Sequence, residues 1–344
     1  MKKILPVGKL DFRFLEFLLK KYEAISDPRV VLGPKVGEDA AVIESPLNAD
    51  RFLVLTIDPI TFATEEIGWY AVQINANDIA VTGADPKLFL VSIHLPEGKT
   101  TKGTVEKIFA QISQASKELG ISVIGGHTEV TYNLDRPIVV GAMLGEVAKE
   151  KLVSTSGAKP GDVIILTKGI VIEGTSIIAR EKQEELKKRG YDEKFIQKCQ
   201  NFLHKPGLSV VRDALLANRF ELHAMHDPTE GGLAAGLYEM AVASEVGLLI
   251  EREKIPIFAE SRILCEEYGL DPLKTITSGS LLIAAAKENS KQIVTSLGKS
   301  RIRAFLIGEV KEQEFGLKIA TGGRVEDLDF SAKDEITKVL SGAV

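Results

Sequence analysis

Two kinds of apolar pattern alternate along this chain, and this alternation constrains the fold more than any other feature. Apolar residues three or four positions apart predict helices over residues 10–22, 66–82, 102–119, 175–189, 192–203 and 228–244. Short continuous apolar runs predict strands over residues 52–58, 88–93, 121–124, 138–147 and 163–167. Because both kinds recur in each half of the chain, the sequence predicts a mixed α/β protein in which helices cover sheets.

The length predicts two domains, since 344 residues exceed the usual size of one domain, which is about 150 residues. Residues 148–162 are small, polar and rich in turn-forming types, which is typical of a connection between domains. We therefore place the boundary near residue 150 and expect domains over 1–150 and 151–344. The hydrophobic fraction of 44% is enough to build large cores and excludes a disordered chain.

Charge and hydropathy exclude two classes of partner. The net charge is −5, which excludes the broad basic surface typical of nucleic-acid-binding proteins. No run approaches the roughly 18 apolar residues of a membrane-spanning helix, and Lys9 and Asp11 interrupt the N-terminal run before it reaches signal-peptide length. Cys199 and Cys265 lack metal-ligand spacing, and we expect both to be core residues. These features predict a cytoplasmic protein that binds neither nucleic acid nor membranes.

Three aspartates lie at or near the ends of predicted elements. Asp39 follows a glycine turn and precedes an apolar run, and Asp58 ends the strand over 52–58. Asp78 shares one face of its helix with Asn75 and Thr82, because residues three, four or seven positions apart lie on the same side. Taken singly, the first two fit ordinary turns and the third fits a solvated helix face. Short oxygen-bearing side chains are also the usual protein ligands of magnesium.

A fourth acid, Glu129, follows the double glycine Gly125-Gly126 at the end of a predicted strand. Glycine at such a position lets the backbone approach a ligand closely. Magnesium is usually held by one or two carboxylates together with the phosphate oxygens of a substrate. Jointly, the four acids therefore predict a site for a magnesium ion and a nucleotide in the first domain.

The second domain carries the run His226-Asp227-Pro228-Thr229-Glu230-Gly231-Gly232 before an apolar helix. One interpretation is a helix capping box, with Asp227 as the cap and Glu230 three positions later. The two glycines cost about 1 kcal/mol each in a helix, and a ligand or another backbone packed against them would explain that cost. His223 and His226 are spaced like some metal pairs, but no third ligand accompanies them, so we expect structural roles.

Five motifs occur in order along residues 33 to about 310: Gly37-Glu38-Asp39, Thr56-Ile57-Asp58, Asn77-Asp78, Gly125-Gly126-His127-Thr128-Glu129 and Asp227-Pro228-Thr229-Glu230-Gly231-Gly232. This series resembles the aminoimidazole ribonucleotide (AIR) synthase-related, PurM-like superfamily and, within it, the HypE-type hydrogenase maturation proteins. The resemblance implies a PurM-like two-domain fold. In that fold the strands of the N-terminal domain form a β-barrel with those of a second subunit, the C-terminal domain is α/β, and the protein is a homodimer.

The resemblance also implies an enzyme that uses ATP and Mg²⁺ to phosphorylate or activate a small-molecule substrate. It implies Asp39, Asp58, Asp78 and Glu129 as metal ligands, and Asp78 and His127 as catalytic residues. The nucleotide-binding residues it implies are Lys35, Gly37, Glu38, Asp39, Asp58, Asn77, Asp78, Gly125, Gly126, Thr128, Asp227, Gly231 and Gly232.

Departures from the family patterns leave the member open. HypE-type proteins end with a cysteine that carries the carbamoyl group to be dehydrated, whereas this chain ends at Val344 without one, so we do not expect that reaction on its own tail. No cysteine precedes Cys199, unlike in selenophosphate synthetases, and His127 stands where HypE-like proteins usually have Asp. The alternative function is therefore a non-catalytic nucleotide-binding scaffold or partner in metalloenzyme (hydrogenase) maturation.

Overall fold

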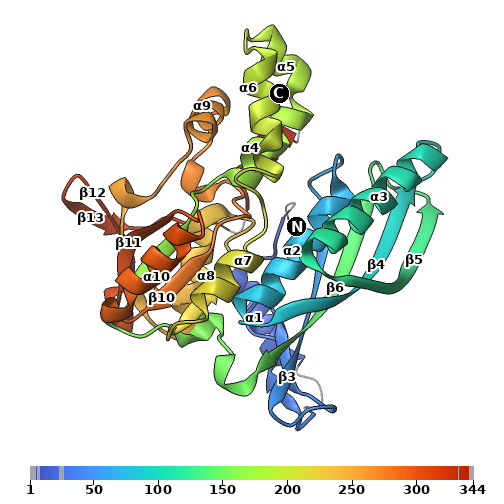
Figure 1. The fold of residues 1–344 in the computed structure, drawn as a ribbon. Helices are drawn as coiled ribbons and strands as arrows, with labels where there is room; N and C mark the ends of the chain where they lie inside the picture. The colour runs from blue at the N-terminus through green and yellow to red at the C-terminus, as the bar shows by residue number, and fades with distance from the viewer. Residues whose placement is uncertain (1–4, 6–7, 23–26, 332, 341–344) are drawn as a thin grey trace. The chain divides into compact units, whose positions relative to one another are not determined.

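The computed structural model describes residues 5, 8–22, 27–331 and 333–340, and these residues form two compact units (Figure 1). The smaller unit contains the described residues of 26–33 and 39–152, and the larger contains those of 1–25, 34–38 and 153–344. Residues 341–344 include the C-terminus, where the sequence has no cysteine; they lie outside the described residues.

The N-terminal helix and segment 34–38 belong to the larger unit, whereas the sequence placed them in the first domain. The physical reason is a shared apolar cluster of Phe12, Val36 and Ala235.

The smaller unit is built on a six-stranded sheet in the order β1-β2-β3-β6-β4-β5. Its strands are β1 (Val30–Leu32), β2 (Ala41–Glu44), β3 (Arg51–Ile60), β4 (Asp85–Pro96), β5 (Ser122–Thr131) and β6 (Ile138–Ala148), and its helices are α2 (Ile67–Val81) and α3 (Lys102–Leu119). A short 3₁₀ helix, η1 (Lys149–Lys151), follows β6. Neighbouring strands are antiparallel except β4 and β5, which are parallel. Strand β5 lies at one edge of this sheet.

The two faces of this sheet differ in burial. Along β6, residues from Val139 to Val147 alternate between buried and partly exposed, as expected when only one face is covered. Helix α2 contacts β3, β4 and β6 on the covered face, and every residue of α2 is buried. The open face carries exposed apolar side chains, including Ile57 at 68% exposure, Leu88 and Leu90. The core of this unit therefore lies between the sheet and α2, with α3 packed against α2 (Figure 1).

The larger unit is built on a seven-stranded sheet in the order β13-β12-β9-β11-β7-β10-β8. Its strands are β7 (Val163–Thr167), β8 (Ala224–His226), β9 (Gly247–Glu251), β10 (Leu282–Ala285), β11 (Ala304–Lys311), β12 (Leu317–Thr321) and β13 (Arg324–Asp327). Its α-helices are α1 (Phe12–Lys21), α4 (Ile172–Glu181), α5 (Gln183–Lys188), α6 (Glu193–Gln200), α7 (Val211–Ala217), α8 (Gly232–Ser244), α9 (Ala259–Tyr268), α10 (Lys287–Lys299) and α11 (Thr337–Leu340). Short 3₁₀ helices are η2 (Thr155–Gly157), η3 (Asn201–Leu203), η4 (Arg252–Lys254), η5 (Pro272–Lys274) and η6 (Gln313–Phe315).

The predicted α/β class is confirmed, and several elements keep their predicted bounds. Helix α3 begins after its cap Thr101 and ends at Gly120, whose φ of 70° is a left-handed conformation that glycine adopts without strain. The single helix predicted over 175–189 is instead two helices, α4 and α5, which meet at Lys182. The strand predicted over 121–124 continues through the double glycine to Thr131. Among the described residues, no helix has both the length and the apolarity needed to cross a bilayer.

Candidate functional site

A hydroxyl group links two of the predicted acidic segments in the smaller unit. The Thr56 Oγ1 atom on β3 lies 2.8 Å from Asp78 Oδ2 on α2 and 3.1 Å from the carbonyl oxygen of Asp39. Asp78 is only 7% exposed, so its carboxylate lies in the interior of the unit. Thr56 therefore joins the side chain of Asp78 to the backbone of Asp39 beside β3.

The third predicted acid, Asp58, is held to the same helix through its backbone. Asn75 accepts a hydrogen bond from the Asp58 N–H at 3.0 Å and donates its amide to the Asp58 carbonyl at 3.3 Å. This pairing occurs because β2 begins at Ala41, opposite Leu55, so the edge of β3 beyond Leu55 needs other partners. The buried Asn75 supplies them and fixes Asp58 two residues from Thr56. The polar stripe predicted on this helix is therefore buried and bonded rather than solvated.

Thr82, the third member of the predicted stripe, has a different role. Its hydroxyl donates to the carbonyl of Ile79 at 2.7 Å, and the residue ends α2. Such a local bond from a threonine to its own helix caps the last turn. Thr82 is thus part of the helix end.

The double glycine lies within β5, and packing against β4 explains the second of the two. A Cβ atom on Gly126 would lie 2.0 Å from the carbonyl oxygen of Val91, which no side chain tolerates. A Cβ atom on Gly125 would meet nothing closer than a Leu90 methyl group at 3.4 Å. The close approach that Gly126 permits is therefore to a neighbouring strand, whereas the sequence had favoured a ligand.

His127 and Glu129 form a polar cluster on β5 with residues of β4. The Glu129 carboxylate lies 3.2 Å from His94 Nδ1 through one oxygen and 3.2 Å from His127 Nε2 through the other. His94 Nε2 in turn lies 2.9 Å from Ser92 Oγ. The hydrogen bonds with His127 and then His94 lower the pKa of Glu129 below its ordinary range. The carboxylate is therefore an anion shared by two imidazole rings.

The strand register separates Glu129 from the three aspartates. Asp58 is opposite Gly141, Gly141 is opposite Val91, and Val91 is opposite Gly126, so these residues share the face that α2 covers. Glu129 is opposite His94, and this pair lies three residues beyond the pair of Gly126 and Val91. Because side chains alternate between the two faces along a strand, Glu129 lies on the open face. Strands β6 and β4 also separate β3 from β5, a lateral distance of roughly 14 Å.

The donor set beside β3 fits a hard cation in its chemistry, since it consists of carboxylates, a hydroxyl and an amide. Across the described part of the chain, however, no three His, Cys, Asp or Glu residues gather in an arrangement able to hold a metal ion. Magnesium needs few protein ligands when phosphate oxygens complete its shell, so a metal assignment for Asp39, Asp58 and Asp78 stays a prediction. Asn77, which is fully buried on α2, stays a predicted nucleotide ligand.

Segment 34–38, which carries three of the predicted nucleotide-binding residues, makes its contacts within the larger unit. Lys35 donates from its amino group to the carbonyl of Ala243 at 2.7 Å. A Cβ atom on Gly37 would lie 2.6 Å from the carbonyl of Glu239, so glycine is needed for this packing. The carboxylate of Glu38 accepts backbone N–H bonds from Thr155 and Ser156, each at 3.2 Å. These contacts fasten the segment to α8 and η2.

Residues 227–231 form a mostly buried loop between β8 and α8, and the capping box was the wrong interpretation. Helix α8 begins at Gly232, its cap is Gly231 in a left-handed conformation, and the Gly231 N–H donates to Asp334 Oδ2 at 2.6 Å. A Cβ on Gly232 would lie 2.6 Å from the carbonyl of Leu273, so another backbone packs against this glycine. Asp227, predicted as a nucleotide ligand, is 2% exposed.

A network that joins the exposed Lys9 to the buried His226 and Glu239 was missed by the sequence reasoning. Glu239 Oε2 lies 3.0 Å from His226 Nε2, and Glu239 Oε1 lies 3.5 Å from the Lys9 amino group. Burial alone would raise the pKa of Glu239, but Lys9 and His226 lower it to about 2. Lys9 also donates to Thr229 Oγ1 at 3.4 Å. No sequence signal connects Lys9 to residues more than 200 positions away.

Other predictions for the larger unit are confirmed. Cys199 and Cys265 are buried free thiols, and burial raises the pKa of each to about 12. His223 Nδ1 lies 2.8 Å from Asp162, so His223, like His226, is held by a carboxylate. These residues are structural, as expected.

Comparison with known proteins identifies the family. Residues 37–147 match the family model of the AIR synthase related protein N-terminal domain, and residues 159–319 match that of its C-terminal domain. A putative hydrogenase expression/formation protein of Methanocaldococcus jannaschii is 31% identical over 331 residues, which cover 93% of this chain and 94% of the relative. A thiamine-monophosphate kinase of Pyrococcus horikoshii is 28% identical over 305 residues, covering 85% of this chain and 88% of the relative.

Similarity to solved structures agrees with this result. The crystal structure of a hydrogenase maturation protein HypE in complex with ATP has a TM-score of 0.65 and 22% identity, and covers 94% of this chain and 93% of that one. The fold is therefore PurM-like, as predicted from the five motifs. This chain belongs to the AIR synthase-related protein family and resembles its HypE-type members.

Proposed function

We propose that this chain is an ATP-dependent, Mg²⁺-requiring enzyme that phosphorylates or otherwise activates a small molecule. The observation that carries the proposal is the contact of Thr56 with both Asp39 and Asp78, beside Asp58. Thr56 thus links the backbone of Asp39 to the carboxylate of Asp78, and Asp58 follows Thr56 by two residues on β3. Membership of a family that includes a HypE structure with ATP and a thiamine-monophosphate kinase supports the use of ATP.

In this proposal Asp39, Asp58 and Asp78 hold magnesium, which when bound neutralises the charge of the phosphates. Thr56 keeps Asp78 in place through its hydrogen bond, and Asn75 fixes the backbone of Asp58. Both positioning residues belong to elements that pack in the core of the smaller unit, so the Asp78 carboxylate and the Asp58 backbone are held before any ligand binds. Glu129 stays a predicted metal ligand, although its carboxylate lies on the other face of the sheet.

The remaining assignments follow the family pattern. We propose Asp78 and His127 as catalytic residues, with His127 placed by its bond to Glu129. The proposed nucleotide contacts are the backbone of Gly125, Gly126 and Thr128, the side chain of Asn77, and the segments that carry Lys35, Gly37, Glu38, Asp227, Gly231 and Gly232.

We propose a homodimer in which a second copy covers the open face of the six-stranded sheet. The exposed apolar residues Ile57, Leu88 and Leu90 and the exposed edge strand β5 support this arrangement, because such surfaces favour association. A maturation protein is a further proposed partner, supported by a solved HypE-HypF complex of the same fold. The cytoplasm is the proposed compartment, supported by two buried free thiols.

The test is ADP formation with Mg²⁺ against a panel of small metabolites, together with ATP binding measured by calorimetry. We expect Asp78→Asn and Asp58→Asn to abolish turnover and weaken Mg²⁺-dependent ATP binding. Asp135→Asn, a change of the same kind at a fully exposed residue, should match the wild type. Equal turnover in the wild type and Asp78→Asn would refute the assignment of Asp78.

The non-catalytic alternative is favoured by one observation, the lack of a three-ligand metal group among the described residues. A scaffold would bind ATP without needing a fully assembled metal site. Tight ATP binding with no turnover on any substrate would support this alternative, and substrate-dependent turnover would exclude it.

A further inference from the structure

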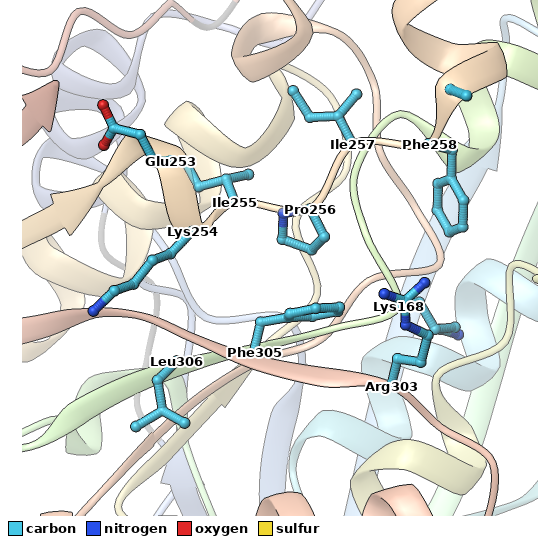
Figure 2. Close-up of a pocket in the computed structure, with 11 residues that line it drawn as sticks. Lys168, Glu253, Lys254, Ile255, Pro256, Ile257, Phe258, Arg303, Phe305 and Leu306 are labelled. Atoms are coloured by element: carbon cyan, nitrogen blue, oxygen red, sulfur yellow. The ribbon is translucent and has the colours of Figure 1, made fainter. Parts of the chain in front are cut away.

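The larger unit contains a pocket of about 550 Å³ that none of the assignments above uses (Figure 2). The pocket lies where the end of β7, residues 253–259 and the start of β11 meet. Its apolar lining includes Pro256, Ile257, Phe258 and Phe305, which are all partly buried. This volume is in the range of small-molecule sites, roughly 300–1,000 Å³. The pocket is therefore large enough for a ring-containing metabolite.

Four charged residues also line the pocket, and three of them are bonded to other described residues. Lys168 lies 3.4 Å from Asp213, Lys254 lies 2.5 Å from Glu251, and the Glu253 carboxylate accepts the Gly322 N–H at 2.7 Å. The fourth is Arg303, whose side chain forms neither an ion pair nor a hydrogen bond with any residue that the structure describes. Its guanidinium lies 5.1 Å from the centre of the Phe305 ring. Arg303 therefore keeps its five donors for a ligand.

The backbone around Arg303 is fixed by the loop that follows β7. The Lys168 N–H donates to the Arg303 carbonyl at 2.7 Å, and Lys168 has a φ of 58°, which is uncommon for a residue with a side chain. A Cβ atom on Gly169 would lie 2.9 Å from the Phe258 ring, so the loop packs closely on this aromatic wall. Figure 2 shows Lys168 and Arg303 together at one end of the pocket and Lys254 and Glu253 at the other.

We propose that this pocket binds a small organic anion with a flat ring, its phosphate or carboxylate on Arg303 and its ring against Phe305 and Phe258. A guanidinium that lies over an aromatic ring presents its donors outward in a fixed fork that matches these anions. The buried ion pair of Lys168 and Asp213 shapes the wall and leaves the anion to Arg303. The proposal does not rest on the nucleotide assignment, because none of its residues belongs to that set.

The test uses phenyl phosphate and benzoate as probes, with binding measured by saturation-transfer NMR and calorimetry. We expect both to bind and benzylamine, a cation of similar shape, not to bind. Arg303→Gln should weaken phenyl phosphate at least about tenfold, since a charged hydrogen bond is worth roughly 1.5–3 kcal/mol. Arg301→Gln, at an exposed residue outside the pocket, should bind like the wild type. Because Arg303 is exposed, its replacement should leave the melting temperature unchanged.

Three results would overturn the proposal. Equal binding by wild type and Arg303→Gln would remove Arg303 from the site. Inorganic phosphate binding as tightly as phenyl phosphate would remove the ring from the ligand class. Displacement of phenyl phosphate by ATP with Mg²⁺, or its loss in Asp78→Asn, would make the pocket part of the nucleotide site. Phenyl phosphate binding that survives in Asp78→Asn would support the pocket even if no ATP turnover is found.

Discussion

Thr56 Oγ1 lies 2.8 Å from Asp78 Oδ2, so a hydroxyl in the middle of β3 is bonded to a buried carboxylate of α2. The same oxygen lies 3.1 Å from the Asp39 carbonyl, just before β2. A hydroxyl has one proton and donates to one acceptor at a time, so the two acceptors share it. This contact ties three acidic segments of the family pattern together before any ligand is considered.

Thr56→Val should weaken this arrangement while keeping the shape of the side chain. We expect a loss of roughly 1–3 kcal/mol in the free energy of unfolding, because the buried Asp78 carboxylate loses a hydrogen-bond donor. Mg²⁺-dependent ATP binding should weaken as well. Thr56→Ser, which keeps the hydroxyl, should stay close to the wild type in urea unfolding and calorimetry. If Thr56→Val and Thr56→Ser show the same unfolding free energy and the same ATP affinity, the hydroxyl has no positioning role.

Gly126→Ala should be far more damaging than Gly125→Ala. Both glycines have a φ near 158°, so the backbone strain of adding a side chain is similar at the two positions. Only at Gly126 would the new Cβ lie 2.0 Å from the Val91 carbonyl oxygen. We expect Gly126→Ala to lower the melting temperature strongly by separating β5 from β4. Equal melting temperatures for the two variants would contradict the packing explanation of the second glycine.

Sequence reasoning was most successful where chemistry and local pattern coincided. Asp39, Asp58 and Asp78 each lie near the end of an element or on a helix face, and Thr56 or Asn75 bonds the Asp78 side chain and the backbones of Asp39 and Asp58. The same reasoning grouped Glu129 with them, because nothing in a single strand shows which neighbours it will have. The sheet order and the register, which depend on pairing with β4, place Glu129 on the open face.

Tertiary contacts also decided what the local pattern left open. Asp227 and Glu230 have the spacing of a capping box, yet the helix begins later, at Gly232. The reason is distant in sequence: Asp334 accepts the Gly231 N–H, and the carbonyl of Leu273 packs where a Gly232 side chain would be. Local propensity contains no information on such partners, so only the folded structure identifies them.

Ile57→Lys should convert a dimer into a monomer if the second copy covers the open face. Ile57 is 68% exposed on that face, and a charge there would have to be buried in the proposed interface. Phe109→Lys is the matched control, since Phe109 is 52% exposed but lies on α3. Sedimentation velocity of the three proteins provides the measurement. A monomeric wild type, or dissociation by both variants, would contradict the proposed face.

Asp334 should make the protein less stable as the pH rises through weakly acidic values. Burial raises the pKa of Asp334 from 3.8 to about 6, despite the hydrogen bonds it accepts from Ile336 and Gly231. Between about pH 4 and 6 the native state therefore holds a proton that the unfolded chain has lost, and the free energy of unfolding falls as pH increases. In Asp334→Asn, which cannot ionise, urea unfolding should show a flatter pH dependence over this range. An unchanged slope would mean that Asp334 is not the titrating group.

Glu239 should have the opposite effect at lower pH. Its pKa of about 2 is below the ordinary 4.5, so ionised Glu239 stabilises the native state above pH 4.5, and this contribution is lost as the pH falls toward 2. Lys9 is one cause of the lowered pKa, and removing its charge in Lys9→Met should raise it, so that the loss is smaller and is complete at a higher pH. Lys20→Met, at an exposed lysine paired with Glu16, should unfold in acid like the wild type. Acid unfolding curves that coincide for all three proteins would show that Lys9 does not control the ionisation of Glu239.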